Sequence, residues 1–267
     1  MDTKLLSLRD TKINTIMIKL SYTDKVSIKV ILLAIISVLA VPYYFTAGGT
    51  LVGFIIIRLF GTVVGGVNTI AHHRWLTHRS FVPHAPGRYL MWTSLILAAN
   101  GRPAQLVIGH RLHHVHTDTA LDPHSPNNHS WINLWLGRFN ISTGSRPPKD
   151  FYRDKEAVFV NKHYWMLYAL FNIALALIDF KTALLFCPVT FTLNWILSTI
   201  INYNGHVLNG VVEPRNMGPV IAWLTCGEGL HKNHHSNQAS YSFASPDRFD
   251  LGAFVIEKFL MAKAPLK

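Results

Sequence analysis

The stretch GHRLHHVHTD, residues 109–118, places four histidines, one arginine and one aspartate within ten residues. Neutral imidazole is the commonest metal ligand among protein side chains, so a metal site is the chemistry that this composition suggests. Histidines also occur in protein cores and on surfaces, and the stretch decides nothing by itself. The other histidines of the chain, 15 in all, provide the test.

Nine histidines occur in four segments with spacings that suit metal binding. In HRLHH and again in HKNHH, positions i, i+3 and i+4 share one face of a helix, so each motif is expected to aim three imidazoles at one point. Nine imidazoles exceed the needs of one ion, and two metal ions with four or five nitrogen donors each would use them. The expected ligands are His73, His78, His110, His113, His114, His206, His231, His234 and His235.

Two of these segments carry further geometric requirements. His73 and His78 are five residues apart and would lie about 140° apart around an ideal α-helix. They therefore require a helix end or kink, or two metals approached from different sides. Asn202 and His206 are spaced i, i+4 at the end of an apolar run, where both can face the same site.

Residues around these histidines have expected supporting roles. A ligating imidazole usually donates its second N–H to a carboxylate or carbonyl, and Asp118, Asp122 and Glu228 are placed for that, with a helix cap or turn as the alternative for each. Arg111 is expected to pair with one of these acids or to meet an anionic substrate head group. The histidines without a ligand spacing are expected to be structural (His84, His129, His163) or supporting or exposed (His72, His116).

Long apolar stretches must position these segments. Residues 30–57 and 182–212 contain no Asp, Glu, Lys or Arg, and a membrane-spanning helix needs about 20 mostly apolar residues. The pattern predicts a single-domain, all-α integral membrane protein with four transmembrane helices in two hairpins and a cytosolic helical cap that holds a histidine-rich dimetal site. The expected spans are about 28–44, 50–70, 164–178 and 183–203, and the cap comprises 71–163 and 204–267.

Charge gives this arrangement an orientation. The two expected hairpin turns are short, so both termini and the segment 71–163 share one side. Of the 25 Lys and Arg residues, all but Arg58 and Lys181 lie on that side, which includes the basic segment 1–27. Positive residues flanking spans are retained in the cytosol, so the termini and the histidines are expected to be cytosolic. Nucleic acid binding is a poor explanation of the net charge of +11, because the basic residues border the expected spans.

With these residues in view, the chain resembles the membrane fatty acyl desaturases of the stearoyl-CoA and the cyanobacterial or bacterial delta-9 type. The resemblance rests on four motifs together, HRWLTH (73–78), GHRLHHVHTDTALDPHSP (109–126), NYNGH (202–206) and GEGLHKNHH (227–235). It implies a centre of two iron ions held by the nine histidines, with Asn202 acting through a water. It also implies four spans in two hairpins beneath a cytosolic catalytic cap.

Two segments depart from the pattern of that family. After His206 the family usually has a longer loop with W-G and D-x-S-R-N elements, of which VLNGVVEPRNMG keeps Arg215 and Asn216. The family commonly continues the last motif as H-H-x-F-P, whereas this chain has HHSNQASYSF. These changes lie at the rim of the site. They are therefore expected to affect the preference for acyl-chain length and the recognition of the head group more than the metal centre.

The removal of hydrogen from an unactivated methylene requires an oxidant that a metal centre with dioxygen can supply and side chains cannot. Imidazole suits iron, copper, nickel and zinc alike, so iron is implied by the resemblance and not by the spacing. The expected function is O2-dependent formation of a cis double bond, delta-9 by analogy, in an acyl chain on a lipid, coenzyme A or acyl carrier protein. Ferredoxin or cytochrome b5 would supply the electrons.

Two other functions use similar residues. A membrane di-iron hydroxylase or ketolase would insert oxygen into a lipid substrate at the same kind of site, although the five-residue spacing of the first motif and GEGLH favour desaturation. A zinc transporter or sensor would place polar ligands within the spans. The histidine segments lie beyond the ends of the expected spans, which favours an enzyme.

Overall fold

The computed structural model describes residues 22–139 and 148–263, so most of the expected basic segment 1–27 lies outside the described residues. The described fold is mostly helical, with two pairs of very short strands. The helices are α1 (Tyr22–Thr46), α2 (Leu51–Thr69), η1 (Ile70–Thr77), α3 (Ala85–Leu97), α4 (Pro103–His116), α5 (Trp131–Trp135), α6 (Lys149–Arg153), α7 (Lys155–Ile178), α8 (Phe180–Asn204), α9 (Pro219–Leu224), α10 (His231–Ser236), α11 (Leu251–Val255) and η2 (Ile256–Leu260). The strands are β1 (Val82–Pro83), β2 (Val207–Leu208), β3 (Val211–Val212) and β4 (Met261–Lys263).

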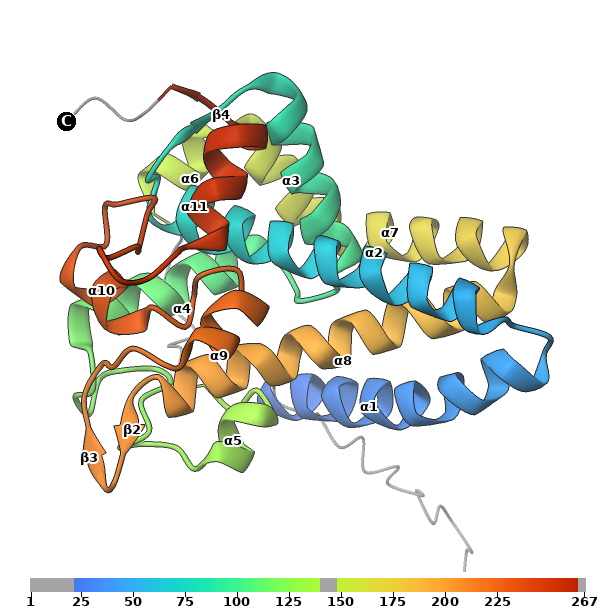
Figure 1. The fold of residues 1–267 in the computed structure, drawn as a ribbon, viewed down its shortest axis with the longest axis horizontal. Helices are drawn as coiled ribbons and strands as arrows, with labels where there is room; N and C mark the ends of the chain where they lie inside the picture. Colours follow the sequence, from blue (N-terminus) through green and yellow to red (C-terminus); the bar gives the residue numbers. More distant parts are fainter. Residues whose placement is uncertain (1–21, 140–147, 264–267) are drawn as a thin grey trace, which may run out of the picture.

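Four long helices, α1, α2, α7 and α8, form a bundle that projects from one end of the molecule (Figure 1). A tight turn joins α1 to α2, and Gly48 in this turn adopts a φ of 81°, which glycine tolerates without steric cost. Thr50 caps α2, because its hydroxyl accepts a hydrogen bond from the Gly53 N–H at 3.0 Å. A single residue, Asp179, separates α7 from α8. Both connections are as short as the sequence predicts.

Among the described residues, three helices are long and apolar enough to cross a membrane. They are Asp24–Thr46, Leu51–Thr77 and Phe180–Asn204, and they contain three of the four expected spans. The remaining expected span, 164–178, forms the later part of α7, whose first turns are charged. This apolar part is shorter than the length of about 20 residues that spanning helices need. The crossing of the membrane by α7 therefore stays a prediction.

Large apolar side chains cover the outward faces of α1 and α2. Val38 is 73% exposed and Leu59 is 62% exposed, and contiguous apolar surface of this kind indicates contact with lipid or protein. Arg58, the charged residue inside the second expected span, turns toward α8 instead. Its Nη1 donates to Thr190 Oγ1 at 3.3 Å. Arg58 therefore has a polar partner within the bundle, as charges in membrane helices usually do.

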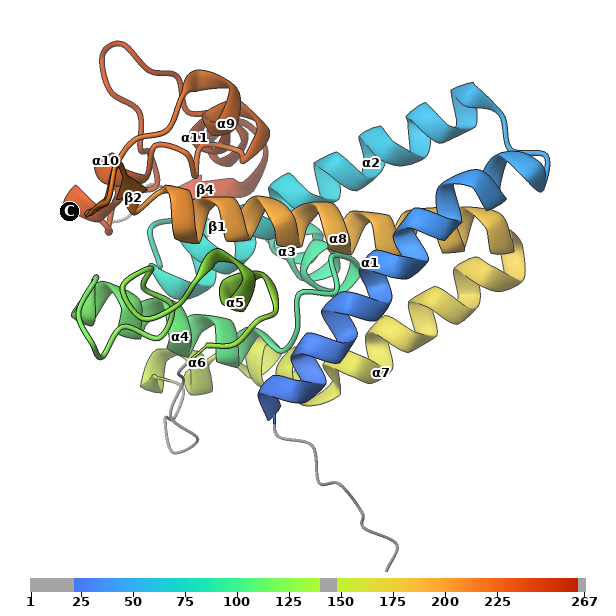
Figure 2. The same ribbon diagram turned by 90° about the horizontal axis from the view of Figure 1, so that it is seen from below.

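Helix α8 is the central element of the bundle, and it packs against α1, α2 and α7 (Figures 1 and 2). Gly61 and Gly65 of α2 permit a close approach, because a Cβ at either position would collide with Thr190 or Asn194 of α8. Small residues four apart allow this kind of packing between membrane helices. Because α8 continues beyond the bundle to Asn204, it carries the NYNGH motif into the cap.

The cap is built around a core that joins η1, α3, α4, α7 and the last helices of the chain. Trp75, Met91, Phe151 and Ile256 are all buried in this core. Tyr164 of α7 is anchored in it, and its hydroxyl donates to a backbone carbonyl of α3 at 2.9 Å. Strand β4 pairs with β1, which ties the end of the described chain to the segment after η1. This core includes residues of η1 and α4, which carry the first two histidine segments, and Cys226, which directly precedes the GEGLHKNHH segment.

Candidate metal centre

The structure gathers the nine expected histidines into two adjoining groups. Within each group, every histidine offers a ring nitrogen that lies within 4.8 Å of those of the others. The five-histidine group consists of His73, His78, His110, His114 and His234. The four-histidine group consists of His113, His206, His231 and His235. Side chains from four separate segments therefore meet in the cap, at the end of the bundle where α8 ends.

The first histidine pair owes its arrangement to a π-helix. In η1, backbone hydrogen bonds join residues five apart, and the N–H of His78 likewise donates to the carbonyl of His73 at 3.1 Å. The wide turn brings residues five apart to one side, and the two imidazole centroids are 4.9 Å apart. Of the two arrangements expected for this pair, the structure has the helix end. The alternative of two metals approached from different sides is wrong, because both histidines belong to one group.

The expectation that each H-x-x-H-H motif aims three imidazoles at one point is wrong. In α4, His110 and His114 belong to the five-histidine group, whereas His113 belongs to the four-histidine group. In α10 the assignment is reversed, since the middle histidine, His234, joins the five-histidine group and the outer two join the other. On an ideal helix the i+3 position lies about 100° from i+4, which is wide enough to face a second centre. Each motif therefore serves both groups and sets the distance between them.

Ring nitrogens face one another inside each group. The Nε2–Nε2 distances are 3.0 Å for His73–His234, 3.0 Å for His110–His114, 2.8 Å for His114–His234, 2.8 Å for His206–His231 and 3.2 Å for His113–His235. Two nitrogens bound at a right angle to one ion at about 2.1 Å would lie about 3 Å apart. The spacing of these nitrogens therefore fits two ligands on the same ion.

Two aspartates of the loop after α4 support the four-histidine group. Asp122 Oδ2 lies 2.7 Å from His113 Nδ1, and Asp118 Oδ2 lies 2.8 Å from His206 Nδ1. Asp118 has a φ of 59°, and its N–H donates to Asp122 Oδ2 at 2.9 Å, so the two acids hold each other in place. An acceptor at Nδ1 fixes the tautomer and leaves the Nε2 lone pair for a metal.

Residues 48–240 match the family model of the fatty acid desaturases. The chain belongs to the fatty acid desaturase family. It is 31% identical over 198 residues to the acyl-CoA 5-desaturase AL21 of Anemone leveillei, a match that covers 68% of this chain and 58% of that protein. It is 31% identical over 210 residues to the acyl-CoA C20 Delta5-desaturase of the same organism, covering 70% and 62%. It is 28% identical over 188 residues to the sn-1 stearoyl-lipid 9-desaturase of Anabaena variabilis, covering 67% and 69%.

The third expected supporting acid, Glu228, contacts the five-histidine group through His73 Nδ1. Glu228 is held in turn by Arg74, whose Nε donates to its Oε1 at 3.2 Å. The fully buried Arg74 also donates to Asp250 Oδ2 at 2.7 Å, and its guanidinium lies 3.8 Å from the ring centroid of Phe243. One buried ion network therefore joins the first histidine motif of this desaturase family member to the last part of its described chain.

Sequence reasoning missed Arg74 and Asp250. Arg74 stands inside HRWLTH as an ordinary basic residue, and nothing local pairs it with an acid 176 positions away. Sequence reasoning also assigns no role to His124, which is 7% exposed and whose ring stacks on that of His113 with centroids 4.3 Å apart. Its place in the DPH motif, two residues after the expected acid Asp122, was the available signal.

The other expected residues occupy varied positions in this desaturase family member. Asn202 is half-buried in the last turns of α8, four residues before His206. His84 caps α3, since its Nδ1 accepts a hydrogen bond from the Gly87 N–H at 2.9 Å. Among the described residues, the histidines outside both groups include His72, His84, His116, His129 and His163.

Arg111 pairs with Asp150 and not with any of the three expected acids. A cleft of about 470 Å³ opens beside this pair, and His78 and His114 of the five-histidine group line it. Gln238 also lines it, and this residue comes from the segment that departs from H-H-x-F-P. The five-histidine group can therefore be approached from this cleft.

The residues of both groups suit a bound metal. Burial lowers the pKa of His114 and of His235 to about 3, so both imidazoles are neutral at physiological pH, which is the form that binds metals. His78 Nε2 is buried without a hydrogen-bond partner in the described structure. An unpaired buried polar atom is costly, and a metal ion at the five-histidine group would satisfy this one.

Proposed function

We propose that this chain is an oxygen-dependent fatty acyl desaturase in which each histidine group binds one iron ion. The observation that carries the proposal is the convergence of nine imidazoles into two adjoining groups. Asn202, one helical turn before His206, would complete the four-histidine group through a water. When bound and reduced, such a centre supplies the oxygen activation that hydrogen removal from an unactivated methylene requires.

The chain's own residues prepare the site for these ions. Asp118, Asp122 and Glu228 keep the Nδ1 proton on their histidines, so that the Nε2 lone pairs remain available. Burial lowers the pKa of His114 and His235, which keeps these imidazoles neutral, and it limits the access of water to the site. The two H-x-x-H-H motifs hold the groups at a fixed separation, because each contributes to both.

The reaction removes one hydrogen from each of two adjacent carbons and leaves a cis double bond. Two further electrons and two protons are needed to reduce O2 to two molecules of water. A separate donor, such as a ferredoxin or cytochrome b5, would provide the electrons. We propose the delta-9 position, which the name of the Anabaena relative supports, whereas the two Anemone relatives are named as delta-5 enzymes.

We also propose that α7 is a fourth membrane span and that the termini and the cap are cytosolic. The short connections α1–α2 and α7–α8 support this topology, because they place the other ends of all four helices toward the cap. Reporter fusions at the Gly48 turn, at Asp179 and at the C-terminus would test it. A cytosolic reporter at either turn would overturn the proposed topology.

Expression in cells that lack their own desaturase, together with a competent electron donor, tests the function. Fatty acids are analysed by mass spectrometry after separation of the lipid classes, with His234→Ala as the inactive control and His163→Ala as the matched active control. A new cis-unsaturated acid with the wild type and with His163→Ala supports the proposal, and the position of its double bond distinguishes delta-9 from delta-5. A hydroxylated product, or no new acid, would overturn it.

A further inference from the structure

Arg111 links the second histidine motif to the end of the first. Its Nε donates to the carbonyl of Thr77 at 2.8 Å, and its Nη2 donates to the carbonyl of Leu76 at 3.3 Å. These are the last two residues of η1, where helical carbonyls lack partners within the helix. Arg111 therefore caps the π-helix that ends immediately before His78, while its own helix carries His110 and His114.

Asp150 of α6 holds Arg111 in this position. Its Oδ1 accepts from Nη1 at 3.0 Å and its Oδ2 accepts from Nη2 at 2.8 Å, which is the bidentate pairing that orients a guanidinium. Burial tends to raise the pKa of Asp150, but hydrogen bonds and charge from Arg111 and Arg79 outweigh this and lower it to about 2. Asp150 is therefore ionised throughout the physiological pH range.

Asp150 also fixes the backbone that leaves the π-helix. Arg79 follows His78 directly and has a φ of 55°, a left-handed conformation that is uncommon for residues with a side chain. Its Nε donates to Asp150 Oδ2 at 3.2 Å, and its Nη2 donates to the Asp150 carbonyl at 3.2 Å. The same aspartate thus restrains the residue after His78 and, through Arg111, the carbonyls before it.

We propose that Asp150 and Arg111 are positioning residues that set the separation of His78 and His114, whose ring centroids lie 4.7 Å apart, and thereby the metal affinity of the five-histidine group. This inference rests on the proposed binding of metal by that group. In this role Arg111 contacts other parts of the protein and not the substrate. Its three side-chain nitrogens already donate to Asp150 and to the end of η1. Recognition of an anionic head group by Arg111 would require these bonds to break.

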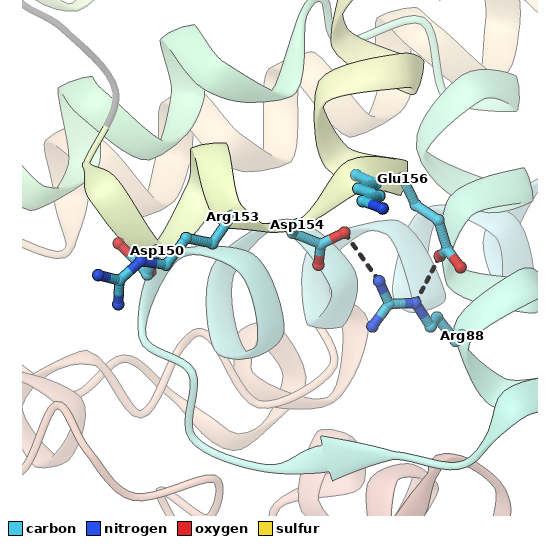
Figure 3. Close-up of a pocket in the computed structure, with 6 residues that line it drawn as sticks. Arg88, Asp150, Arg153, Asp154 and Glu156 are labelled. Atoms are coloured by element: carbon cyan, nitrogen blue, oxygen red, sulfur yellow. Dashed lines mark hydrogen bonds and ion pairs between the residues drawn. The ribbon is translucent and has the colours of Figure 1, made fainter.

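The same surface offers a matched control. Figure 3 shows Arg88 between Asp154 and Glu156, farther along the surface from Asp150. Glu156 is 44% exposed and pairs with an arginine that is 31% exposed, and Asp150 is 40% exposed and pairs with an arginine that is also 31% exposed. Glu156 accepts from Arg88 and from Trp92, and neither residue belongs to a histidine motif. Glu156→Gln therefore removes a similar charge pair without removing a hydrogen bond to η1, which Arg88 and Trp92 contact only by packing on the ring of Trp75.

The test is a titration of the purified, metal-free full-length chain with Co²⁺, followed by its visible absorption and by the cobalt content per chain. The wild type is expected to bind two Co²⁺ in two steps of the titration. His110→Ala should weaken the step that belongs to the five-histidine group, and His231→Ala the step that belongs to the four-histidine group. Asp150→Asn is expected to lower the Co²⁺ affinity of the five-histidine group about tenfold, which is at the low end of the effect seen for residues that support metal ligands. Asp150→Glu should restore most of it, and Glu156→Gln should change neither step.

Thermal unfolding of each variant separates positioning from stability. We expect Asp150→Asn and Glu156→Gln each to lower the midpoint only slightly, because both acids are partly exposed, so that the cobalt titration distinguishes them. Identical titrations of these two variants, or a loss at the four-histidine group alone, would overturn the positioning role. Failure of the wild type to bind Co²⁺ would instead overturn the metal centre itself, and the two failures are therefore distinguishable.

Discussion

The two histidine groups draw on the same pair of H-x-x-H-H motifs, yet they are supported from different parts of the chain. Asp118 and Asp122, which contact the four-histidine group, lie in one loop directly after α4. The five-histidine group depends on Glu228, Arg74 and Asp250, which the fold brings together from distant positions. The four-histidine group is thus supported by two acids from one loop, of which Asp118 contacts His206 88 positions away, and the five-histidine group by a buried ion network that spans up to 176 positions.

The groups also differ in their access to solvent. Of the four-histidine group, only His235 is more than slightly exposed, and the other three are buried. In the five-histidine group, His78 and His114 line the cleft beside Arg111. The two proposed metal ions, although close together, would therefore not be equally accessible to small molecules.

The largest expected effect comes from the removal of a histidine from either group. His113→Ala leaves three histidines in one group, and His234→Ala leaves four in the other. Both variants should lose desaturation, and His113→Ala should lose more bound iron because fewer ligands remain for its ion. Iron content of the purified proteins and fatty acid profiles measure this. Full iron content in both variants would contradict the proposed ligands.

Substitution of a supporting acid should have a smaller effect and should separate the two networks. Asp118→Asn and Glu228→Gln are each expected to lower activity or metal affinity about 10–100-fold. Only Glu228→Gln should also destabilise the protein, by about 1–3 kcal/mol, because it removes a buried carboxylate acceptor of Arg74, which keeps Asp250 as its partner. Metal titration and thermal unfolding measure the two effects. Equal destabilisation by both substitutions would remove the contrast between a local and a long-range support.

Metal removal should proceed in two phases. A chelator can approach the five-histidine group through the cleft lined by His78 and His114, whereas most of the four-histidine group is buried. The first ion should therefore leave faster than the second, and His231→Ala should accelerate mainly the slow phase. Iron release over time measures this, and a single phase for the wild type would argue that both groups are equally accessible.

The smallest expected effects come from histidines outside both groups. His84→Ala removes the cap of α3, which typically costs about 1 kcal/mol, and should leave desaturation unchanged. His163, whose ring packs against Phe159 with centroids 4.8 Å apart, should tolerate alanine within about 0.5 kcal/mol. Thermal unfolding and product profiles measure both. Loss of activity in either variant would mean that the two groups do not contain the whole site.

Much of the candidate site is legible in the sequence. Spacing and the resemblance to the desaturases together indicate nine histidines, and the structure gathers the same nine into two groups. Three of the four expected spans lie in helices long and apolar enough to cross a membrane. These features are local, because helical periodicity and hydropathy depend on neighbouring residues.

Only the tertiary structure decided how the histidines divide. Helical spacing places His110, His113 and His114 near one face of α4, but the direction from which α10 approaches determines which of them meets His234. The π-helix at His73 and the pairing of Arg74 with Asp250 likewise depend on packing between segments far apart in the chain. Sequence spacing sets the angle between side chains on one helix, whereas the distance and crossing of two helices are set by the core between them.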